Sequence, residues 1–171
     1  MLIDFDSLVK KYRINAKGVL HLGASEGQEA PTYKRHGYKM AFVEALPHMI
    51  GALKSTLITN GITASVYEAC VSDCVKQVTF NVSNNRGQSS SYLEFGTHTK
   101  QHPTIKFTDR LRMVTTTVND LIENLKDYDL LVMDLQGAEL DALKGTDLSG
   151  FKWIYTEVNK DELYKGCALL P

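Results

Sequence analysis

The segment 19–29 (VLHLGASEGQE) most constrains the fold, because an apolar run there ends in a turn of small residues and a helix-like segment follows. A short apolar run that meets glycine is typical of a buried parallel strand leading into a ligand-binding turn. A second apolar run, 40–43, ends at Glu44. Apolar runs and helix-like segments alternate in this way as far as residue 71, which predicts parallel strands joined by right-handed crossovers.

The complete pattern predicts an α/β fold with helices on both faces of a mostly parallel sheet. Strands are expected over 19–22, 40–44, 64–71, 77–82, 113–118, 129–134 and 152–158. Helices are expected from Asp4 or Asp6 to about Arg13, and over 28–36, 47–59, 119–125 and 139–143. We expect a single domain over 1–171, with an N-terminal helix within 1–16. The polar stretch 77–118 is expected to be an insertion over the sheet and a candidate lid.

Composition excludes several classes of protein. The chain has 171 residues, enough for one domain with its own core, and a net charge of -1 gives no reason to expect a polyanion as partner. No basic, aromatic surface pattern indicates nucleic acid. The N-terminus has no signal-peptide pattern, and no apolar run approaches the ~20 residues of a membrane span. Three cysteines without a pairing pattern fit a reducing compartment, so we expect a cytoplasmic protein. Oligomeric state stays open.

Acidic residues follow the expected strands. Parallel sheets bind ligands at the carboxyl ends of their strands, and the residues expected there are Gly23, Glu44, 69–71, Asp134 and Glu157. Carboxylates crowded at one edge repel one another, which raises their pKa. A ligand with positive charge, or a metal ion, relieves that repulsion.

Two cofactors compete for this edge. A nicotinamide dinucleotide normally requires Gly-x-Gly-x-x-Gly around its pyrophosphate, whereas this turn reads Gly-Ala-Ser-Glu-Gly, with Glu26 inside it. A carboxylate there repels a pyrophosphate. S-adenosylmethionine carries a sulfonium and an ammonium group and no phosphate, so the charge of the turn favours it. A nicotinamide-dependent oxidoreductase remains the alternative.

Three segments carry a resemblance to a known family: 19–27 (VLHLGASEG), 42–47 (FVEALP) and 133–140 (MDLQGAEL). With 115–121, they are similar to the FkbM-type S-adenosylmethionine-dependent methyltransferases. This resemblance implies the class I methyltransferase fold, a Rossmann-like three-layer sandwich, and methylation of a hydroxyl on a small molecule, sugar or glycan. His21 stands where many relatives carry Asp. The sequence stops just after the fifth core strand, so the family's C-terminal hairpin is expected to be missing.

The predicted cofactor site follows the strand ends. Glu44 is expected to accept hydrogen bonds from both ribose hydroxyls, and 69–71 to line the adenine. The turn after the first strand is expected to hold the methionine end, with helix capping as the alternative role of Ser25. The full predicted set is His21, Gly23, Ala24, Ser25, Glu26, Gly27, Glu29, Glu44, Ala45, Ala69, Cys70, Val71, Asp134 and Gln136.

Acceptor chemistry requires a group that takes a proton from a hydroxyl. Asp134, His98 and His102 are the candidates, although both histidines lie in the polar stretch, where a solvated loop position is the competing interpretation. Asp134 is equally a candidate for holding the cofactor or a metal ion, while no dedicated metal site is predicted. Glu157 and Asn159 are expected to face the same crevice and bind the acceptor. A protein that binds the cofactor without transferring the methyl group is the second alternative.

Overall fold

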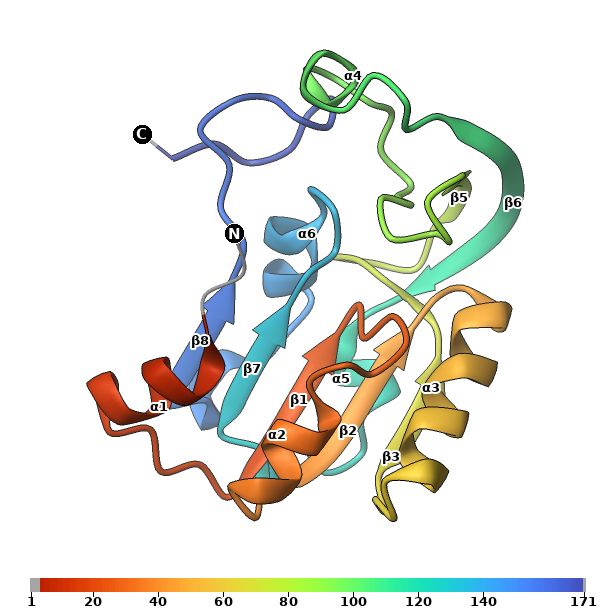
Figure 1. Cartoon of the computed structure of the whole chain (residues 1–171). Helices are drawn as coiled ribbons and strands as arrows, with labels where there is room; N and C mark the ends of the chain where they lie inside the picture. The colour runs from red at the N-terminus through yellow and green to blue at the C-terminus, as the bar shows by residue number, and fades with distance from the viewer. Residues whose placement is uncertain (1–3, 171) are drawn as a thin grey trace.

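The computed structural model describes residues 4–170, and its centre is a five-stranded parallel sheet in the order β3–β2–β1–β7–β8 (Figure 1). The strands are β1 (Gly18–Leu22), β2 (Lys39–Glu44), β3 (Ser65–Glu68), β7 (Leu130–Met133) and β8 (Trp153–Thr156). The chain order reverses between β1 and β7, the point at which open sheets bind ligands. The predicted mostly parallel sheet is confirmed.

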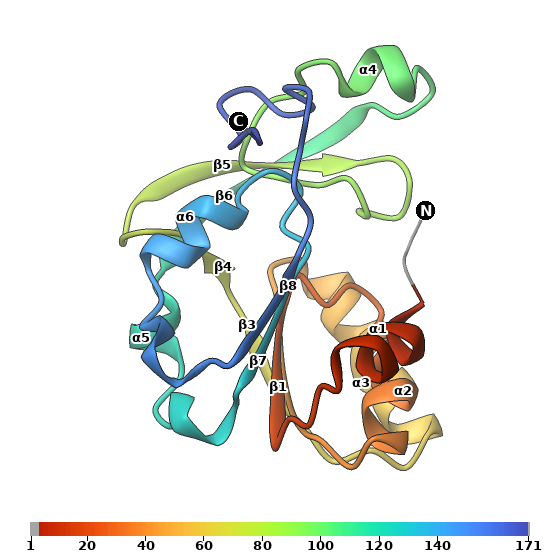
Figure 2. The ribbon, with the colours of Figure 1, turned by 90° about the vertical axis from the view of Figure 1, so that its left-hand side faces the viewer.

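Helices cover both faces of this sheet, as Figure 2 shows edge-on. One face carries α1 (Phe5–Tyr12), α2 (Ala30–Arg35) and α3 (Pro47–Thr59); the other carries α5 (Val118–Leu121) and α6 (Glu139–Lys144). Alternate residues of β1 pack into different layers: Val19 joins the core under α2 and α3, whereas Leu20 joins the core under α5 and α6. Because both faces are covered, every residue of β1 and β7 is buried. The predicted three-layer sandwich is confirmed.

Local signals set most helix bounds. Asp4 caps α1 by accepting a hydrogen bond from the Ser7 backbone N–H at 3.1 Å. Pro47 opens α3, which ends at the predicted residue. The predicted helix 119–125 is displaced, because Thr117 caps α5 by accepting from the Asp120 N–H at 3.0 Å, and a short 3-10 helix follows over Leu125–Asp127. A second 3-10 helix, Leu148–Gly150, precedes β8.

The predicted strand 64–71 is wrong as a single element. It divides into β3 in the main sheet and β4 (Cys70–Val71), which pairs with β6 instead. The Ala69 N–H donates to the Glu44 carbonyl at 2.9 Å, and after this bond the chain leaves β2. Cys70 then lies opposite Thr115 of β6, so the strand changes sheets at the edge where ligands bind.

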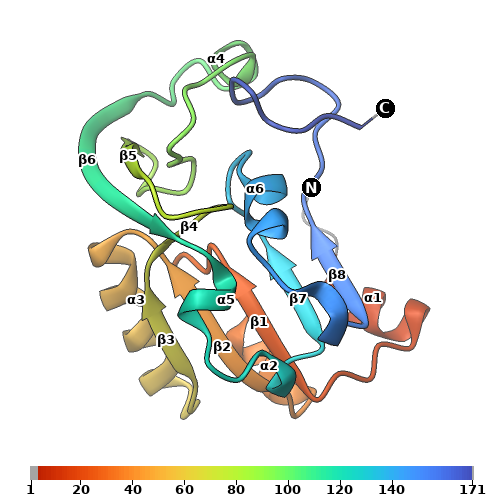
Figure 3. The ribbon, with the colours of Figure 1, turned by 180° about the vertical axis from the view of Figure 1, so that it is seen from behind.

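A second sheet, in the order β4–β6–β5, lies across the carboxyl ends of the main strands (Figures 2 and 3). Its antiparallel pair is β5 (Gln77–Ser83) and β6 (Phe107–Thr116), so the predicted strand 113–118 begins earlier than expected. The connection between them holds α4 (His98–Gln101). Residues 157–170 return to this connection, where the Gly96 N–H donates to the Leu163 carbonyl at 2.8 Å.

The helices within 4–170 are all too short or too polar to cross a bilayer.

Candidate active-site cavity

A cavity of about 460 Å³ opens at the carboxyl ends of β1, β2 and β7, and Phe80 of β5 is also among its lining residues. Its volume is in the range of small-molecule sites. The walls come from the turn after β1, the end of β2, the β3–β4 region, the segment 85–105, the turn after β7 and the C-terminal segment. The predicted site residues among its walls are Gly23, Ser25, Glu29, Glu44, Ala45, Ala69, Cys70, Val71, His98, His102, Asp134, Gln136 and Glu157.

Five predicted residues do not line the cavity, and the first of them is His21. Its side chain is 4% exposed and lies in the core under α2, where Nδ1 is 3.3 Å from the Tyr33 hydroxyl and the ring packs near Phe42. Alternation along β1 explains this position. His21 lies on the same face of the strand as Val19, which packs in the core under α2 and α3 and not at the cavity.

The other four residues outside the cavity walls are Ala24, Glu26, Gly27 and Asn159. Ala24 is buried in the same core, and a side chain at Gly27 would meet Leu53 of α3 at 2.4 Å. Gly27 therefore permits close helix packing. Half-buried Glu26 is also absent from the cavity walls. Asn159 is buried in the C-terminal segment, where its carbonyl accepts from the Leu170 N–H at 2.8 Å.

Gly23 brings two of the strand ends together. Its φ is +78°, and a Cβ there would lie 1.9 Å from the Asp134 carbonyl oxygen. The turns after β1 and β7 therefore touch, which requires glycine for contact as well as for conformation. Ser25 follows with φ of +48°, so the turn presents its backbone N–H toward β2.

Glu44 receives that N–H and organises the turn. Its Oε2 accepts from Ser25 at 2.8 Å, while Oε1 accepts from the N–H groups of Ala45 at 2.8 Å and Leu46 at 2.9 Å. A carboxylate offers about four acceptor positions, so Oε2 keeps free capacity at the cavity wall. Burial raises the pKa of Glu44, and the three backbone bonds oppose that rise.

Carboxyl groups crowd the other side of the same turn. Oxygen atoms of Asp134, Glu139 and Glu157 lie within 4.8 Å of one another, and Glu29 stands nearby on the cavity wall. Glu139 is buried, whereas Asp134 and Glu157 keep exposed surface. Partial loss of hydration raises the pKa of all four, and the charge of Asp134 raises those of Glu29, Glu139 and Glu157 further. Glu139 is partly satisfied, because its Oε1 accepts from the Leu135 N–H at 2.8 Å. A bound cation or proton would reduce the repulsion among these carboxylates.

The opposite wall is neutral. It includes His98, His102, Ile105, Leu163 and Tyr164 from the inserted connection and the C-terminal segment. The solvated-loop interpretation is wrong for His98, which is 4% exposed; His102 is exposed. Burial lowers the pKa of His98, and the neighbouring His102 lowers it further.

Comparison with known proteins decides the family. The chain matches the Methyltransferase FkbM domain over residues 21–170. It belongs to the FkbM methyltransferase domain family. The five-stranded Rossmann-like sheet agrees with that assignment.

A curated relative is similar to part of this FkbM domain. The 2-O-methyltransferase NoeI of Sinorhizobium fredii (strain NBRC 101917 / NGR234) is 29% identical over 111 residues, which cover 59% of this chain and 46% of the relative. This chain therefore spans less than half the length of the relative that it matches.

The sequence did not predict Tyr164, which connects the C-terminal segment with the segment 85–105 and the turn after β7 in the FkbM-domain cavity. Its hydroxyl lies 2.6 Å from the Gln136 Oε1 and 3.2 Å from the Ser89 carbonyl oxygen, and both can accept its proton. Gln136 in turn donates its side-chain N–H to Asp134. Tyr164 stands in an irregular segment, and no motif or periodicity marks it.

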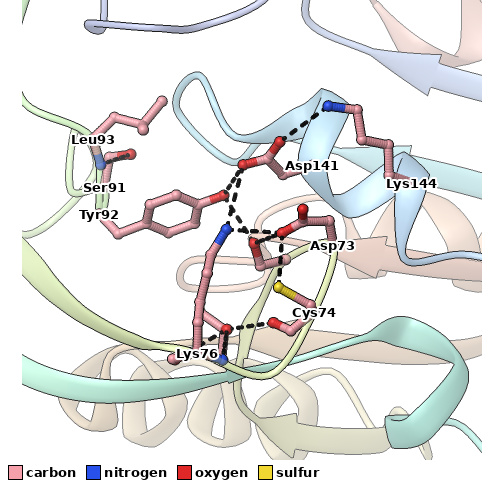
Figure 4. A network of polar contacts seen from close by, with 10 residues as sticks. Asp73, Cys74, Lys76, Ser91, Tyr92, Leu93, Asp141 and Lys144 are labelled. Atoms are coloured by element: carbon pink, nitrogen blue, oxygen red, sulfur yellow. Dashed lines mark hydrogen bonds and ion pairs between the residues drawn. The ribbon is translucent and has the colours of Figure 1, made fainter.

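A second tyrosine, Tyr92, ties the insertion to α6 (Figure 4). Its hydroxyl donates to the Asp141 carboxylate at 2.9 Å and lies 3.3 Å from that of Ser72. Lys76 pairs with Asp73 at 2.8 Å and approaches Asp141 at 3.9 Å. This network holds the β5–β6 sheet against the other end of the cavity, and no sequence pattern indicated it.

Proposed function

We propose that this domain transfers a methyl group from S-adenosylmethionine to a hydroxyl oxygen of a small molecule, sugar or glycan. The observation that carries the proposal is the division of the cavity into an anionic wall and a neutral wall that meet at Asp134. Membership of a methyltransferase family supports the reaction type. The similar NoeI is named a 2-O-methyltransferase, which supports oxygen as the acceptor atom.

The chemistry of the anionic wall fits the donor. Bound S-adenosylmethionine supplies an electrophilic methyl on a cationic sulfur, together with an ammonium group. Glu29, Asp134 and Glu157 are the carboxylates that would meet these positive charges, and the raised pKa of each supports this assignment. No phosphate has to approach them.

The remaining donor contacts follow the predicted assignment. Glu44 would accept a ribose hydroxyl on the free side of Oε2, while its other acceptor positions keep the turn after β1 in place. The apolar side chains of Ala69 and Val71, with buried Cys70, would form the adenine wall; burial raises the pKa of that thiol to about 12 and keeps it neutral.

The neutral wall would hold the acceptor, with the 77–118 insertion acting as its lid. In the proposed reaction the acceptor oxygen would form a bond to the methyl carbon as the carbon–sulfur bond breaks, and the hydroxyl proton would pass to a base. Asp134 stands where the two walls meet, and burial raises its pKa, which makes the carboxylate a stronger base. Positioning of donor and acceptor in line supplies most of the rate enhancement.

Calorimetry with S-adenosylhomocysteine tests the donor site. Glu44→Gln is expected to weaken binding by about 10- to 100-fold, because a charge-assisted hydrogen bond contributes ~1.5–3 kcal/mol. Glu68→Gln is the matched control: Glu68 lies opposite Glu44 on β3 but is exposed, so affinity should not change. Circular dichroism of both variants separates a binding defect from unfolding.

Three outcomes separate the candidate functions. Incubation with methyl-labelled S-adenosylmethionine and a panel of methyl hexopyranosides should give labelled product. Tight binding of S-adenosylhomocysteine without product from any acceptor would favour a binding protein that has no transfer activity. Affinity for NAD and none for S-adenosylhomocysteine would favour an oxidoreductase and remove the basis of the proposal.

A further inference from the structure

His98 lies in the neutral wall, and its two ring nitrogens differ in their surroundings. Within residues 4–170, its Nδ1 is one of two side-chain polar atoms that are buried without a hydrogen-bond partner; Nε2 is not among them. The ring stacks on Phe95 with centroids 4.3 Å apart and planes within 4°. Phe95 stacks in turn on Phe107 at 3.7 Å, so the stack restrains the plane of the imidazole ring.

This arrangement decides which nitrogen carries the proton. A neutral imidazole has one N–H donor and one acceptor nitrogen. A proton on Nδ1 would leave a buried N–H without an acceptor, a defect that costs ~1–3 kcal/mol and is rarer in proteins than an unfilled lone pair. The neutral ring is therefore most stable with its proton on Nε2.

The charged form has the same defect. An imidazolium carries a proton on both nitrogens, so protonation would again place an unpaired N–H at Nδ1. The titratable groups that face the ring are His102, at 4.9 Å between ring centroids, and Tyr164, at 5.5 Å. Neither is a carboxylate that would stabilise a positive charge.

We propose that His98 is not the base, and that its Nε2–H is a hydrogen-bond donor to an oxygen of the acceptor. The reacting hydroxyl must give its proton away and keep a lone pair free for the methyl carbon. An N–H donor cannot take that proton, and a hydrogen bond donated to the reacting oxygen would make that oxygen a weaker nucleophile. His98 therefore binds a second oxygen, so the acceptor is a polyol or sugar with another oxygen near the methylated one. This inference rests on the proposed function, and it leaves Asp134 and His102 as candidates for the base.

Nitrogen-15 NMR of the full chain tests the tautomer without cofactor or acceptor. The chain has five histidines, and the His98 signals are those lost in His98→Gln, with His102→Gln as the matched control for assignment. We expect the Nε2–H pattern at neutral pH and protonation only below the ~6.5 of an ordinary histidine. An Nδ1–H pattern, or a midpoint at or above that value, would overturn the proposal.

Kinetics test the donor role. With the methyl hexopyranoside that gives most product, His98→Gln keeps a side-chain N–H and should retain kcat within tenfold. His98→Leu has no donor and should raise KM at least tenfold. A thousandfold loss of kcat in folded His98→Gln would identify a base and contradict the inference. If no methyl hexopyranoside reacts, the proposed acceptor class fails, while the NMR spectrum still decides the tautomer.

Discussion

His21 makes the stability of this domain sensitive to mild acid. The side chain is buried under α2, between the Tyr33 hydroxyl and Phe42, with no carboxylate among these contacts. Burial lowers its pKa to about 4 from 6.5. In the unfolded chain it titrates at ~6.5. As the pH falls through 6.5 the unfolded chain binds a proton that the folded chain does not, so stability decreases until the pH reaches about 4.

The size of this effect follows from the two pKa values. Each pH unit inside the window costs up to ~1.4 kcal/mol, so ~2.5 kcal/mol is lost between pH 7.5 and pH 4.5. The cavity carboxyls act in the opposite direction. Their pKa values are raised by folding, so their contribution to stability grows as they bind protons at lower pH. The effect of His21 is therefore isolated only as a difference between two proteins.

The comparison protein is His21→Leu. At pH 7.5 the variant should be less stable by ~1–2 kcal/mol, because the buried Tyr33 hydroxyl loses its partner. It has no imidazole to titrate, so its deficit should shrink by ~2.5 kcal/mol toward pH 4.5 and change sign. Urea unfolding at four pH values, followed by the fluorescence of the single tryptophan, measures both curves. His102→Gln controls for the loss of an exposed histidine. Parallel curves for wild type and His21→Leu would refute the argument.

Three other variants test contacts of the parallel sheet and of the site at its edge. Gly23→Ala should cost on the order of 3 kcal/mol or more in urea unfolding, because its Cβ would lie 1.9 Å from the Asp134 carbonyl oxygen; Gly37→Ala, with φ of +72° but open space around the Cβ, should cost only ~1 kcal/mol. Asp129→Asn should lose ~1–3 kcal/mol at pH 7, because the buried carboxylate accepts from the Lys17 N–H at 2.8 Å and pairs with Lys152 at 3.1 Å. Burial raises the pKa of Asp129, but these contacts hold it below its usual value. The carboxylate therefore stabilises the fold above about pH 4, and this stabilisation is lost at lower pH. The variant should lack this acid-dependent loss of stability. Tyr164→Phe should weaken S-adenosylhomocysteine binding several-fold in calorimetry, because Gln136 is released from its position against Asp134; Tyr38→Phe, which removes a buried hydroxyl bonded to the Ile14 carbonyl, should leave that affinity unchanged.

The sequence predicted the elements whose limits are set by neighbouring residues. Helix α3 runs over Pro47–Thr59 as expected, because a proline at its start and Asn-Gly after its end are local signals. The sheet was predictable for a related reason: short, wholly apolar runs fit strands that are covered on both faces. The strand ends then located the ligand edge, and Glu44 and Asp134 both line the cavity there.

Long-range partners explain what the sequence did not predict. The change of sheet at Cys70 depends on Thr115, which is distant in the chain. A strand pattern also gives alternation without saying which face meets the ligand. His21 was predicted to bind the cofactor as the position where many relatives carry Asp, and its side chain lies on the face toward α2. Tyr164 reaches Gln136 only because the C-terminal segment returns over the sheet.

The same distinction applies to the two walls of the cavity. The anionic wall comes from turns of the parallel sheet, and these turns can be predicted because glycine and acidic residues follow the apolar strands in the sequence. The neutral wall comes from segments outside that sheet, which meet through contacts such as the Gly96 N–H to the Leu163 carbonyl. On the proposed function, donor binding depends on the sheet turns and acceptor choice on the insertion and the C-terminal segment. Substitutions at His98 or Ile105 should therefore change which hydroxyl compound reacts while leaving S-adenosylhomocysteine affinity intact, whereas substitutions at Glu44 should do the reverse.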